Sequence, residues 1–454
     1  MNRESSVEDL AERTGEPVAR LCEWRSLGLI GSEDGEWFRP DDVERVRLIQ
    51  LFLRRGIDLQ TIAKAARGAV FSRLLSGYLD KFASGPAGAT YSLADAADRL
   101  GLDVTIVRKF HEALGEPDDY LDEEEIEFMK GWALALESGL PEEAVVQLLR
   151  VYADALGRVG EAEVRLFHFY VHERLRAAGL SLPEATRMTE AASERLLPLA
   201  EPAVLYFHRR GFTRAWREDL VTHLEEEAGL LGKVEVPGQL QAAIVFVDLS
   251  SFGAMSEAMG DEAAAAVLNR FSELVREAVH RWHGRLVKQI GDAFMLVFPD
   301  PSSAIACALG IEGRAVAEPQ FPAVRSGVHW GSVLYREGDY LGSNVNIAAR
   351  LAAQAHRHQV LVTQAVRREA KGLAEVEFAP VGKRPLKGLV EDLELFEARP
   401  SGVGNAVKVV DPVCGMELQP REVAARLSLE GEERAFCSEE CLRRFMAAPQ
   451  RYSR

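Results

Sequence analysis

The sequence contains no apolar run approaching the ~20 residues that a membrane-spanning helix needs, so we expect no membrane span. Its first residues, MNRESSVEDLAERTG, lack the apolar segment of a signal peptide. The sequence has no excess of basic residues, and its net charge is −16. A protein that coats nucleic acid needs a basic surface, so the charge argues against that class. The five cysteines are too few for a disulfide scaffold. These absences predict a cytoplasmic protein in a reducing compartment.

What is present is globular sequence on the scale of several domains. The 454 residues are 47% hydrophobic and 27% charged, which is enough apolar material for more than one core. We predict a multidomain chain with an all-α N-terminal region, an α+β ferredoxin-like domain and a small α+β C-terminal module. The predicted domain ranges are 1–75, 86–231, 236–400 and 408–454.

The N-terminal region reads as a set of short helices that occurs twice. LAERTG (Leu10–Gly15) matches AADRLG (Ala96–Gly101), and similar segments follow each of them at a comparable distance, which predicts an internal repeat. Both copies resemble the helix-turn-helix and wing layout of the MerR family. In a DNA-binding member the second helix would read bases, but here its basic residues, Arg20 and Arg25 in the first copy, are balanced by Glu23 and its neighbours. We therefore do not expect DNA as a partner.

Residues 131–232 follow a helix pattern almost throughout. Apolar residues recur three and four positions apart between Pro141 and Ala178, and further helices are predicted over Pro183–Arg209 and Thr213–Glu227. From Leu93 to about Glu227 the chain resembles the helical regulatory domain that precedes the catalytic domain in some bacterial adenylate cyclases. The resemblance implies that this region regulates a catalytic domain placed after it.

The most informative stretch is GRLVKQIGDAFMLVF, Gly284–Phe298. Two apolar runs flank the pair Gly291-Asp292, which predicts a β-hairpin with its turn at that pair. The charges are unusual, since Lys288 lies inside an apolar strand and Asp292 lies at the turn. An aspartate in a turn is ordinarily a turn former, so the interpretation of Asp292 depends on a second acidic strand end.

That second strand end is Asp248, in the apolar run AAIVFVDLSSFG. The elements predicted around the hairpin are a helix over Asp261–Trp282, a helix over Ser302–Val316 and a strand over Ala323–Leu334. This β-α-β-β-α-β order is the ferredoxin-like arrangement, in which the first strand and the hairpin are neighbours. Asp248 and Asp292 then converge at one end of the sheet. Two close carboxylates repel unless a cation lies between them, and such oxygen ligands suit Mg²⁺ or Mn²⁺.

A helix is predicted from Ser343 or Asn344 onward within GDYLGSNVNIAARL. Asn346 and Arg350 are four residues apart and therefore share one face of that helix. An amide and a guanidinium aimed at one point can hold a ribose and an anionic phosphate. Alone this signal is weak, because Asn and Arg often share a solvated helix face.

Together, FVDLSSFG, VKQIGDAFM and GDYLGSNVNIAAR resemble the class III nucleotidyl cyclases in order and spacing, over about Gln241–Ala398. The resemblance implies that Asp248 and Asp292 bind two Mg²⁺ or Mn²⁺ ions per active site. The reaction it implies is attack of the ribose 3′-oxygen of ATP on the α-phosphorus, which yields 3′,5′-cyclic AMP and pyrophosphate. Catalysis of this kind depends mostly on positioning and electrostatics.

The resemblance also gives roles toward the nucleotide to further residues. Lys288 and Asp339 would recognise the adenine ring, Asn346 would orient the ribose, and Arg350 would stabilise charge on the transferred phosphoryl group. The segment RPLKGL resembles the family's late phosphate-contacting segment and adds Lys387. A lysine donates and an aspartate accepts, which suits the edge of adenine and favours ATP over GTP.

The spacing within the hairpin bears on assembly. Lys288 and Asp292 are four residues apart, roughly 13 Å at ~3.3 Å per residue if the strand is continuous, which places them poorly for one site in one subunit. In the family the site lies between two catalytic domains, so the resemblance implies a homodimer with two equivalent active sites.

The last segment, with DPVCGM and then FCSEEC, resembles the YHS family, a small module often linked to metals. Cys414, Cys437 and Cys441 offer three thiolates, which suit Zn²⁺ or Cu⁺. A fourth ligand is not evident from the sequence. Packed thiols in a ββα-like module that mediates contacts are the alternative.

Three functions remain open at this point. The first is a regulated adenylate cyclase, and the second is a MerR-like transcription regulator whose cyclase domain only senses nucleotide. The third is a protein that uses the cyclase fold to bind nucleotide without turnover. The complete set of six metal- and nucleotide-binding residues and the acidic N-terminal region favour the first.

Overall fold

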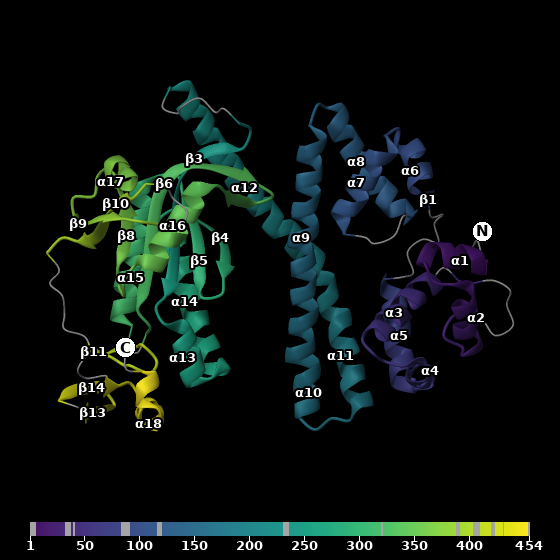
Figure 1. The fold of residues 1–454 in the computed structure, drawn as a ribbon. Coiled ribbons are helices and arrows are strands. Elements are labelled where there is room, and N and C mark those ends of the chain that lie inside the picture. The colour runs from purple at the N-terminus through teal and green to yellow at the C-terminus, as the bar shows by residue number, and fades with distance from the viewer. Residues whose placement is uncertain are drawn as a thin grey trace. The chain divides into compact units, whose positions relative to one another are not determined.

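The computed structural model describes residues 6–31, 38–39, 41–82, 91–115, 120–229, 236–318, 321–386, 391–402, 409–418, 423–429 and 431–452. The chain divides into two compact units, Met1–Gly232 and Lys233–Arg454, which we describe separately (Figure 1). Across the described ranges, no helix is both long enough and apolar enough to cross a membrane.

The described part of the first unit is helical apart from one pair of short antiparallel strands, β1 (Tyr91–Ser92) and β2 (Tyr120–Leu121). Its helices are α1 (Val7–Thr14), α2 (Val18–Ser26), α3 (Asp42–Arg54), α4 (Leu59–Arg67), α5 (Ala69–Phe82), α6 (Leu93–Leu100), α7 (Val104–Leu114), α8 (Glu123–Glu137), α9 (Glu142–Phe167), α10 (Arg174–Ala177), α11 (Leu182–Leu196) and α12 (Ala200–Glu227). A π-helical turn, His168–Glu173, joins α9 to α10. This agrees with the predicted all-α region.

The same order of helices occurs twice in this unit. The first set, α1 to α3, surrounds a core that contains Leu10 and Trp24, and the second set, α6 to α8, surrounds a core that contains Phe110. α1 ends at Gly15 and α6 ends at Gly101, and both glycines adopt the left-handed conformation that terminates a helix. The matched sequence segments therefore have matching local structure.

The predicted boundary between the last two helices of this unit is wrong. The chain breaks its helix at the 3₁₀ turn Leu197–Leu199, and α12 then runs from Ala200 to Glu227 without interruption. Pro198 lies in that turn, where a residue without a backbone N–H is tolerated. Gly211 lies inside α12, since a glycine costs a helix interior only about 1 kcal/mol.

The second unit is built on an eight-stranded sheet with the order β4-β5-β3-β6-β8-β10-β9, and β7 pairs with β6. The strands are β3 (Gln239–Leu249), β4 (Arg285–Ile290), β5 (Ala293–Phe298), β6 (Val324–Arg336), β7 (Asp339–Leu341), β8 (Val360–Thr363), β9 (Val376–Arg384) and β10 (Leu393–Pro400). The helices are α13 (Phe252–Met259), α14 (Asp261–Arg281), α15 (Pro301–Ala317), α16 (Ser343–Gln354) and α17 (Gln364–Glu369). Only β6 and β8 are parallel among the pairs that the structure describes.

The predicted ferredoxin-like core is confirmed. The strands β6, β3, β5 and β4 lie in the order that β-α-β-β-α-β connectivity requires, and the hairpin turn falls at Gly291-Asp292. One helix was not predicted. This helix, α13, begins at Phe252, shortly after the first strand ends at Leu249. Its sequence, FGAMSEAM, is too short and too rich in small residues to show a helical period.

The first strand is buried on both faces. Ala243, Val245 and Val247 pack into the cluster that includes α14 and α15. Ala242, Ile244 and Phe246 pack into the cluster that includes α16. Because side chains alternate along a strand, Asp248 belongs to the second set and faces the side of the sheet that α16 covers.

Gly327 of β6 allows α16 to lie directly on the sheet. A Cβ at this position would lie 2.3 Å from the backbone N of Ala352 and 2.5 Å from the carbonyl O of Ala348. We expect Gly327→Ala to reduce the free energy of unfolding by about 3 kcal/mol, because helix and sheet must separate. Thermal unfolding measures this. Gly313→Ala, inside α15 with nothing within 4 Å of the added atom, is the matched control; equal melting temperatures for the two variants would contradict the close contact.

The second unit ends in a small module, which we call the C-terminal module (Val409–Tyr452). Its elements are β11 (Val409–Val410), β12 (Glu417–Leu418), β13 (Ala425–Leu429), β14 (Glu432–Phe436), α18 (Glu439–Ala447) and the 3₁₀ turn Pro449–Arg451. The strands form two hairpins, β11 with β12 and β13 with β14. Buried residues of the module, among them Val413 and Phe445, belong to the same cluster as Met255 of α13. The predicted small α+β module is therefore present and packs on the larger sheet domain.

Candidate active site

Two carboxylates meet where β3 and β5 lie side by side. Asp248 of β3 pairs in register with Ala293, the residue that follows Asp292. Burial and then the negative charge of Asp248 raise the pKa of Asp292 from 3.8 to about 6. The structure therefore brings together the two aspartates that the sequence singled out.

Arg325 of β6 lies beside the same carboxylates and was not predicted. It pairs in register with Asp248, and its Nε and Nη2 donate to Oδ2 of Asp248 at 2.9 and 2.5 Å. Its positive charge opposes the rise in the pKa of Asp292. The sequence signal for Arg325 is a charged residue within an apolar strand, and Lys288 has the same signal.

The donor set at this point suits a hard divalent cation. Asp248 and Asp292 offer carboxylate oxygens, and burial followed by the charge of Asp248 raises the pKa of Asp292, although the charge of Arg325 opposes the rise. Oxygen ligands with unbalanced negative charge are what Mg²⁺ and Mn²⁺ prefer. The residues therefore fit such an ion.

Lys288 and Asp339 form a second pair, which joins β4 to β7. The ammonium of Lys288, on β4, donates to Oδ2 of Asp339, which begins β7. The other oxygen of Asp339 accepts a hydrogen bond from the backbone N–H of Tyr340 at 2.8 Å. The two side chains are 40% and 32% exposed, so a ligand can reach both.

Asn346 and Arg350 lie on α16 with their functional groups available. The helix turns Ile347 and Leu351 toward the sheet, while Asn346 is exposed and Arg350 is half-buried. Among the described residues, the side chains of Asn346 and Arg350 have no hydrogen-bond or ion-pair partner. Both side chains can therefore bind a ligand without first breaking a contact.

Asn344 has the opposite character, although it lies in the same motif. Its Oδ1 is 2.9 Å from Nε2 of His329, and its Nδ2 donates to the carbonyl O of Ser332 at 2.6 Å. A Cβ at Gly331 would lie 2.6 Å from Nδ2 of Asn344. Asn344 therefore anchors the start of α16 to β6.

The estimate of roughly 13 Å between Lys288 and Asp292 is wrong in its premise. β4 ends at Ile290, and Asp292 belongs to the turn, so the chain does not stay extended between the two residues. Lys288 pairs with Met295, two residues along β5 from Ala293. Lys288 and Asp292 instead have different neighbours: Lys288 donates to Asp339, and Asp292 lies beside Asp248. Lys387, the remaining candidate, lies outside the described residues.

The three predicted thiols also converge, in the C-terminal module. Sγ of Cys437 lies 3.5 Å from Sγ of Cys414 and 3.6 Å from Sγ of Cys441. The sequence showed no fourth ligand, but the fold supplies Asp411, which is fully buried and has a carboxylate oxygen within 4.8 Å of all three sulfurs. Asp411 precedes Pro412 and accepts hydrogen bonds from the backbone N–H groups of Val413 and Cys437.

Three segments of the chain match known protein families. The profile of the adenylate and guanylate cyclase catalytic domain matches residues 234–397, that of the YHS domain matches 409–454, and that of the MerR helix-turn-helix family matches 5–69. The crystal structure of the adenylyl cyclase CyaB from P. aeruginosa is 19% identical, covers 37% of this chain and 98% of that chain, and superposes with a TM-score of 0.32.

Two relatives extend over most of the chain. An uncharacterised protein of Mycobacterium tuberculosis H37Rv is 30% identical over 338 residues, which is 71% of this chain and 83% of the relative. A protein of M. tuberculosis CDC 1551 named as a pH-sensitive adenylate cyclase is 27% identical over 372 residues, 78% of this chain and 88% of that protein. With the matched catalytic-domain profile and the converging aspartates, these similarities show that the chain belongs to the class III adenylate and guanylate cyclase family.

Proposed function

We propose that this protein is an adenylate cyclase that converts ATP to 3′,5′-cyclic AMP and pyrophosphate. The observation that carries the choice of ATP is the contact between Lys288 and Asp339 within a cyclase catalytic domain. The pair presents a donor and an acceptor side by side. N1 of adenine accepts and its 6-amino group donates, whereas guanine reverses both groups at that edge. A relative named as an adenylate cyclase matches 78% of the chain, which supports the same substrate.

The carboxylates would hold the ions that the family uses, two Mg²⁺ or Mn²⁺ per active site. Ions bound by Asp248 and Asp292 would lower the pKa of the ribose 3′-hydroxyl and neutralise phosphate charge. Arg325 holds Asp248 in place beside Asp292. α13 begins four residues after Asp248, and N–H groups in the first turn of a helix suit phosphate oxygens. The carboxylates and the helix start therefore form one surface for a metal–triphosphate group.

Asn346 and Arg350 would act on the sugar and the reacting phosphate. The exposed amide of Asn346 can hold the ribose so that its 3′-oxygen faces the α-phosphorus. The guanidinium of Arg350, one helical turn further along α16, can stabilise the negative charge that develops as pyrophosphate leaves. Lys387 is proposed as a further phosphate contact.

We propose a homodimer with the active sites between subunits. The side chains of Asn346 and Arg350 make no hydrogen bond or ion pair with a described residue of their own chain, so their ligand can be shared with a second copy. The first unit supports the same assembly, because α12 has no buried residue along its 28 positions. Its large exposed apolar side chains are Leu205, Tyr206, Phe207, Phe212, Trp216, Leu220, Val221 and Leu224.

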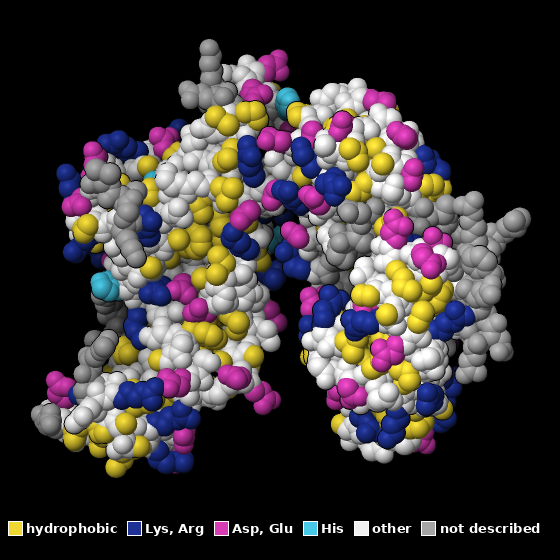
Figure 2. Space-filling view, turned by 45° about the vertical axis from the view of Figure 1, so that its right-hand side comes forward, with side chains coloured by type: hydrophobic (Ala, Val, Ile, Leu, Met, Phe, Trp, Pro, Cys, Tyr) yellow, Lys and Arg dark blue, Asp and Glu magenta, His cyan; other side chains and the backbone are white. Residues whose placement is uncertain are grey.

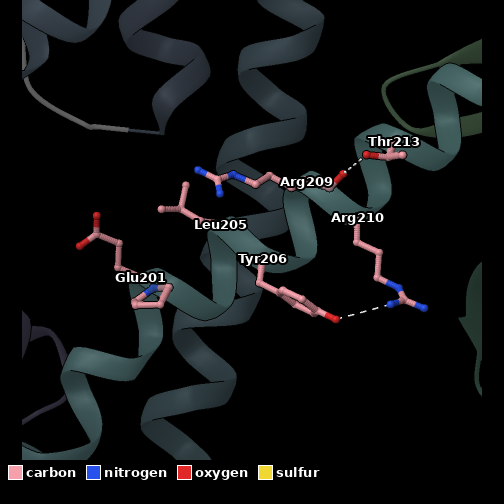
Figure 3. A pocket seen from close by; sticks show the side chains of 7 residues that line it. Glu201, Leu205, Tyr206, Arg209, Arg210 and Thr213 are labelled. Atoms are coloured by element: carbon pink, nitrogen blue, oxygen red, sulfur yellow. Dashed lines mark hydrogen bonds between the residues drawn. The ribbon is translucent and has the colours of Figure 1, made fainter.

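Figure 3 shows one face of α12 from close by. The described residues that line the hollow there, including Leu205, Tyr206 and Arg209, all come from α12 itself. Arg210 donates to the hydroxyl of Tyr206 at 3.4 Å, and no other helix contributes a described lining residue. Such a surface is the side of a helix whose apolar side chains are exposed. A second copy of the chain would remove this apolar area from water.

The N-terminal region is proposed to regulate the catalytic domain. It carries the MerR-like match and the repeated helical sets, and acidic and basic side chains alternate over the face in view in Figure 2. A net charge of −16 for the chain does not favour binding to DNA phosphates. The match to the relative named as pH-sensitive covers 78% of the chain, which is more than the catalytic domain alone, and this supports a regulatory role for the rest.

The C-terminal module is proposed to bind a soft metal ion, Zn²⁺ or Cu⁺. A tetrahedral ion ~2.3 Å from each sulfur requires sulfurs about 3.8 Å apart, and the two recorded sulfur distances are 3.5 and 3.6 Å. Asp411 can supply the fourth ligand of a tetrahedral Zn²⁺ site, whereas three thiols alone suffice for Cu⁺. The two ions are distinguished by metal analysis of the purified protein.

The affinity of the active site for Mn²⁺ should decrease as the pH falls through about 6. The pKa of Asp292 is raised to about 6, so a proton competes with the cation over the range in which this carboxyl becomes neutral. Titration of Mn²⁺ followed by electron paramagnetic resonance at pH 5, 6, 7 and 8 measures the effect. Asp292→Asn should remove the pH dependence together with most of the affinity. A flat affinity for the unaltered chain between pH 5 and 7 would contradict the pairing of the two carboxylates.

The proposed activity is tested with the purified full-length chain, Mn²⁺ and either ATP or GTP. We expect cyclic AMP from ATP and at least ~10-fold less cyclic GMP from GTP, because one mismatched donor–acceptor edge is worth more than a tenfold preference. Formation of cyclic GMP at an equal rate would contradict the roles of Lys288 and Asp339. Nucleotide binding without either product would support the non-catalytic alternative.

A further inference from the structure

The turn that follows Asp248 has an uncommon backbone conformation. Ser251 adopts φ 65°, in the left-handed region that residues with a Cβ rarely occupy and that persists where neighbouring contacts hold it. Ser251 is also the N-cap of α13, and its carbonyl accepts the hydrogen bond of Met255 N–H at 3.0 Å. The conformation of Ser251 therefore sets how α13 starts beside Asp248.

Arg357 holds this turn from outside. It lies in the loop between α16 and β8, and it is half-buried. Its Nη2 donates to the hydroxyl of Ser251 at 2.7 Å, and its Nη1 donates to the carbonyl O of Gly415 in the C-terminal module. One guanidinium thus joins the turn after Asp248 to the residue that follows Cys414.

Gly415 allows the module to come close enough for this contact. Its φ is 74°, and a Cβ there would lie 2.6 Å from Nη2 of Arg357 and 2.6 Å from Cβ of Ser251. Any side chain at this position would separate the module from the turn. The thiol cluster and the turn are therefore connected through the backbone of Gly415 and the side chain of Arg357.

The module also holds the far end of α13. Arg444 donates to the carbonyl O of Glu257 at 2.6 Å, and Arg451 pairs with the carboxylate of Glu257. Ala254 and Val413 line a cavity of about 270 Å³ at this contact. α13 is thus held at its start through Arg357 and near its end by two arginines of the module.

We propose that the C-terminal module is a metal-dependent clamp that positions the turn Ser250–Phe252 for the metal–triphosphate group, and that Arg357 is the positioning residue that connects them. The inference rests on the metal site proposed for the module. Cys414 lies next to Gly415, whereas Cys437 and Cys441 lie beyond the second hairpin, so an ion bound by all three cross-links two separate segments. The bound ion would hold Gly415 in position through Cys414. Gly415 in turn holds the guanidinium of Arg357, which holds Ser251 in the turn. Loss of the ion frees this contact and weakens the hold on the triphosphate.

Hydrogen exchange of the full-length chain tests the clamp without relying on turnover. The chain is stripped of metal, reloaded with Zn²⁺ alone as the probe, and zinc stoichiometry and thiol reactivity are measured on the same samples. We expect one zinc per chain, protection of the thiols, and about tenfold slower exchange of backbone amides in the peptide 249–260. Cys437→Ser should lose this zinc and the change in exchange, which separates the module from the carboxylates of the active site.

Variants on both sides of the contact test the connection. Arg357→Ala lies outside the module, so zinc should still bind while the exchange of 249–260 becomes independent of zinc. Gly415→Ala should have the same effect on exchange through the clash with Arg357 and Ser251. Gly431→Ala is the matched control, because Gly431 also has a positive φ, 87°, but an added Cβ meets nothing within 4 Å. It should behave as the unaltered chain does.

Each alternative result overturns part of the inference. Zinc bound by the thiols with unchanged exchange of 249–260 contradicts the clamp. A zinc effect that survives in Arg357→Ala contradicts the role of Arg357. If the unaltered chain binds no zinc after reloading, the zinc site and the zinc-dependent clamp are both contradicted. If zinc alters the exchange but the chain forms no cyclic AMP, the clamp stands and the proposed cyclase activity fails.

In an active enzyme, Arg357→Ala should raise the KM for metal–ATP about tenfold with a smaller change in kcat.

Discussion

Replacing Asp292 by asparagine should reduce the formation of cyclic AMP at least about 10³-fold. The side chain keeps its size, but the site loses one of the two carboxylates that converge there and with it a charged ligand for the ions. Because the ions are proposed to activate the 3′-hydroxyl and to neutralise the phosphates, kcat should fall whatever the substrate concentration. Initial rates at saturating Mn²⁺ and ATP measure this directly.

Asp261→Asn is the control for this loss. Asp261 is an exposed acid in the first turn of α14, and its substitution removes the same charge without reaching the site. It should change kcat by less than about twofold, the usual size of a surface substitution. An Asp292→Asn enzyme that keeps a tenth or more of the normal kcat would show that this carboxylate is not a metal ligand.

Arg350→Ala should cost about 10²–10³ in kcat with a much smaller change in the KM for ATP. Arg350 has no hydrogen bond or ion pair among the described residues, so its removal breaks no recorded contact within the chain. A guanidinium that binds mainly the charge developing in the transition state contributes to kcat, and loss of one such donor has this magnitude. Steady-state kinetics over a range of ATP concentrations separate the two parameters.

Arg314→Ala is the comparison for Arg350→Ala. Arg314 is half-exposed and pairs with Glu277 at 2.6 Å. It lies on α15, which carries none of the proposed site residues. Its loss should leave kcat unchanged, and Arg350→Lys should recover little, because an ammonium does not reproduce the planar donor geometry. Full activity in Arg350→Ala would remove this residue from the active site.

Sequence alone predicted the core of the catalytic fold well, for reasons that are local. The two apolar runs around Gly291-Asp292 predicted both strands and the turn, and the long apolar run before Asp248 predicted the central strand. Once those strands were ordered, the convergence of Asp248 with Asp292 followed from the connectivity. The resemblance to cyclases, confirmed by the matched family profile, added the roles of the other residues, which remain proposals.

What the sequence did not show depends on contacts between distant segments. Arg325 meets Asp248 across 77 positions, and only strand pairing reveals the contact. Asp411 lies 26 positions before Cys437, and only the fold of the module brings its carboxylate to the thiols of Cys437 and Cys441. The bridge from Arg357 to Gly415 has no sequence signal, since neither residue stands out in its own segment.

The central claim is that one active site uses residues of two subunits, and subunit mixing tests it most directly. Asp292→Ala removes a metal ligand and Asn346→Ala removes a ribose contact, so each homodimer should be inactive. If the sites are shared, random exchange of subunits gives heterodimers with one intact site of two, and activity should recover to about a quarter of the normal value. Mixing Asp248→Ala with Asp292→Ala should recover nothing, because both changes affect the metal-binding side. A mixture of Asp292→Ala with Asn346→Ala that stays inactive although its subunits exchange would contradict the shared site.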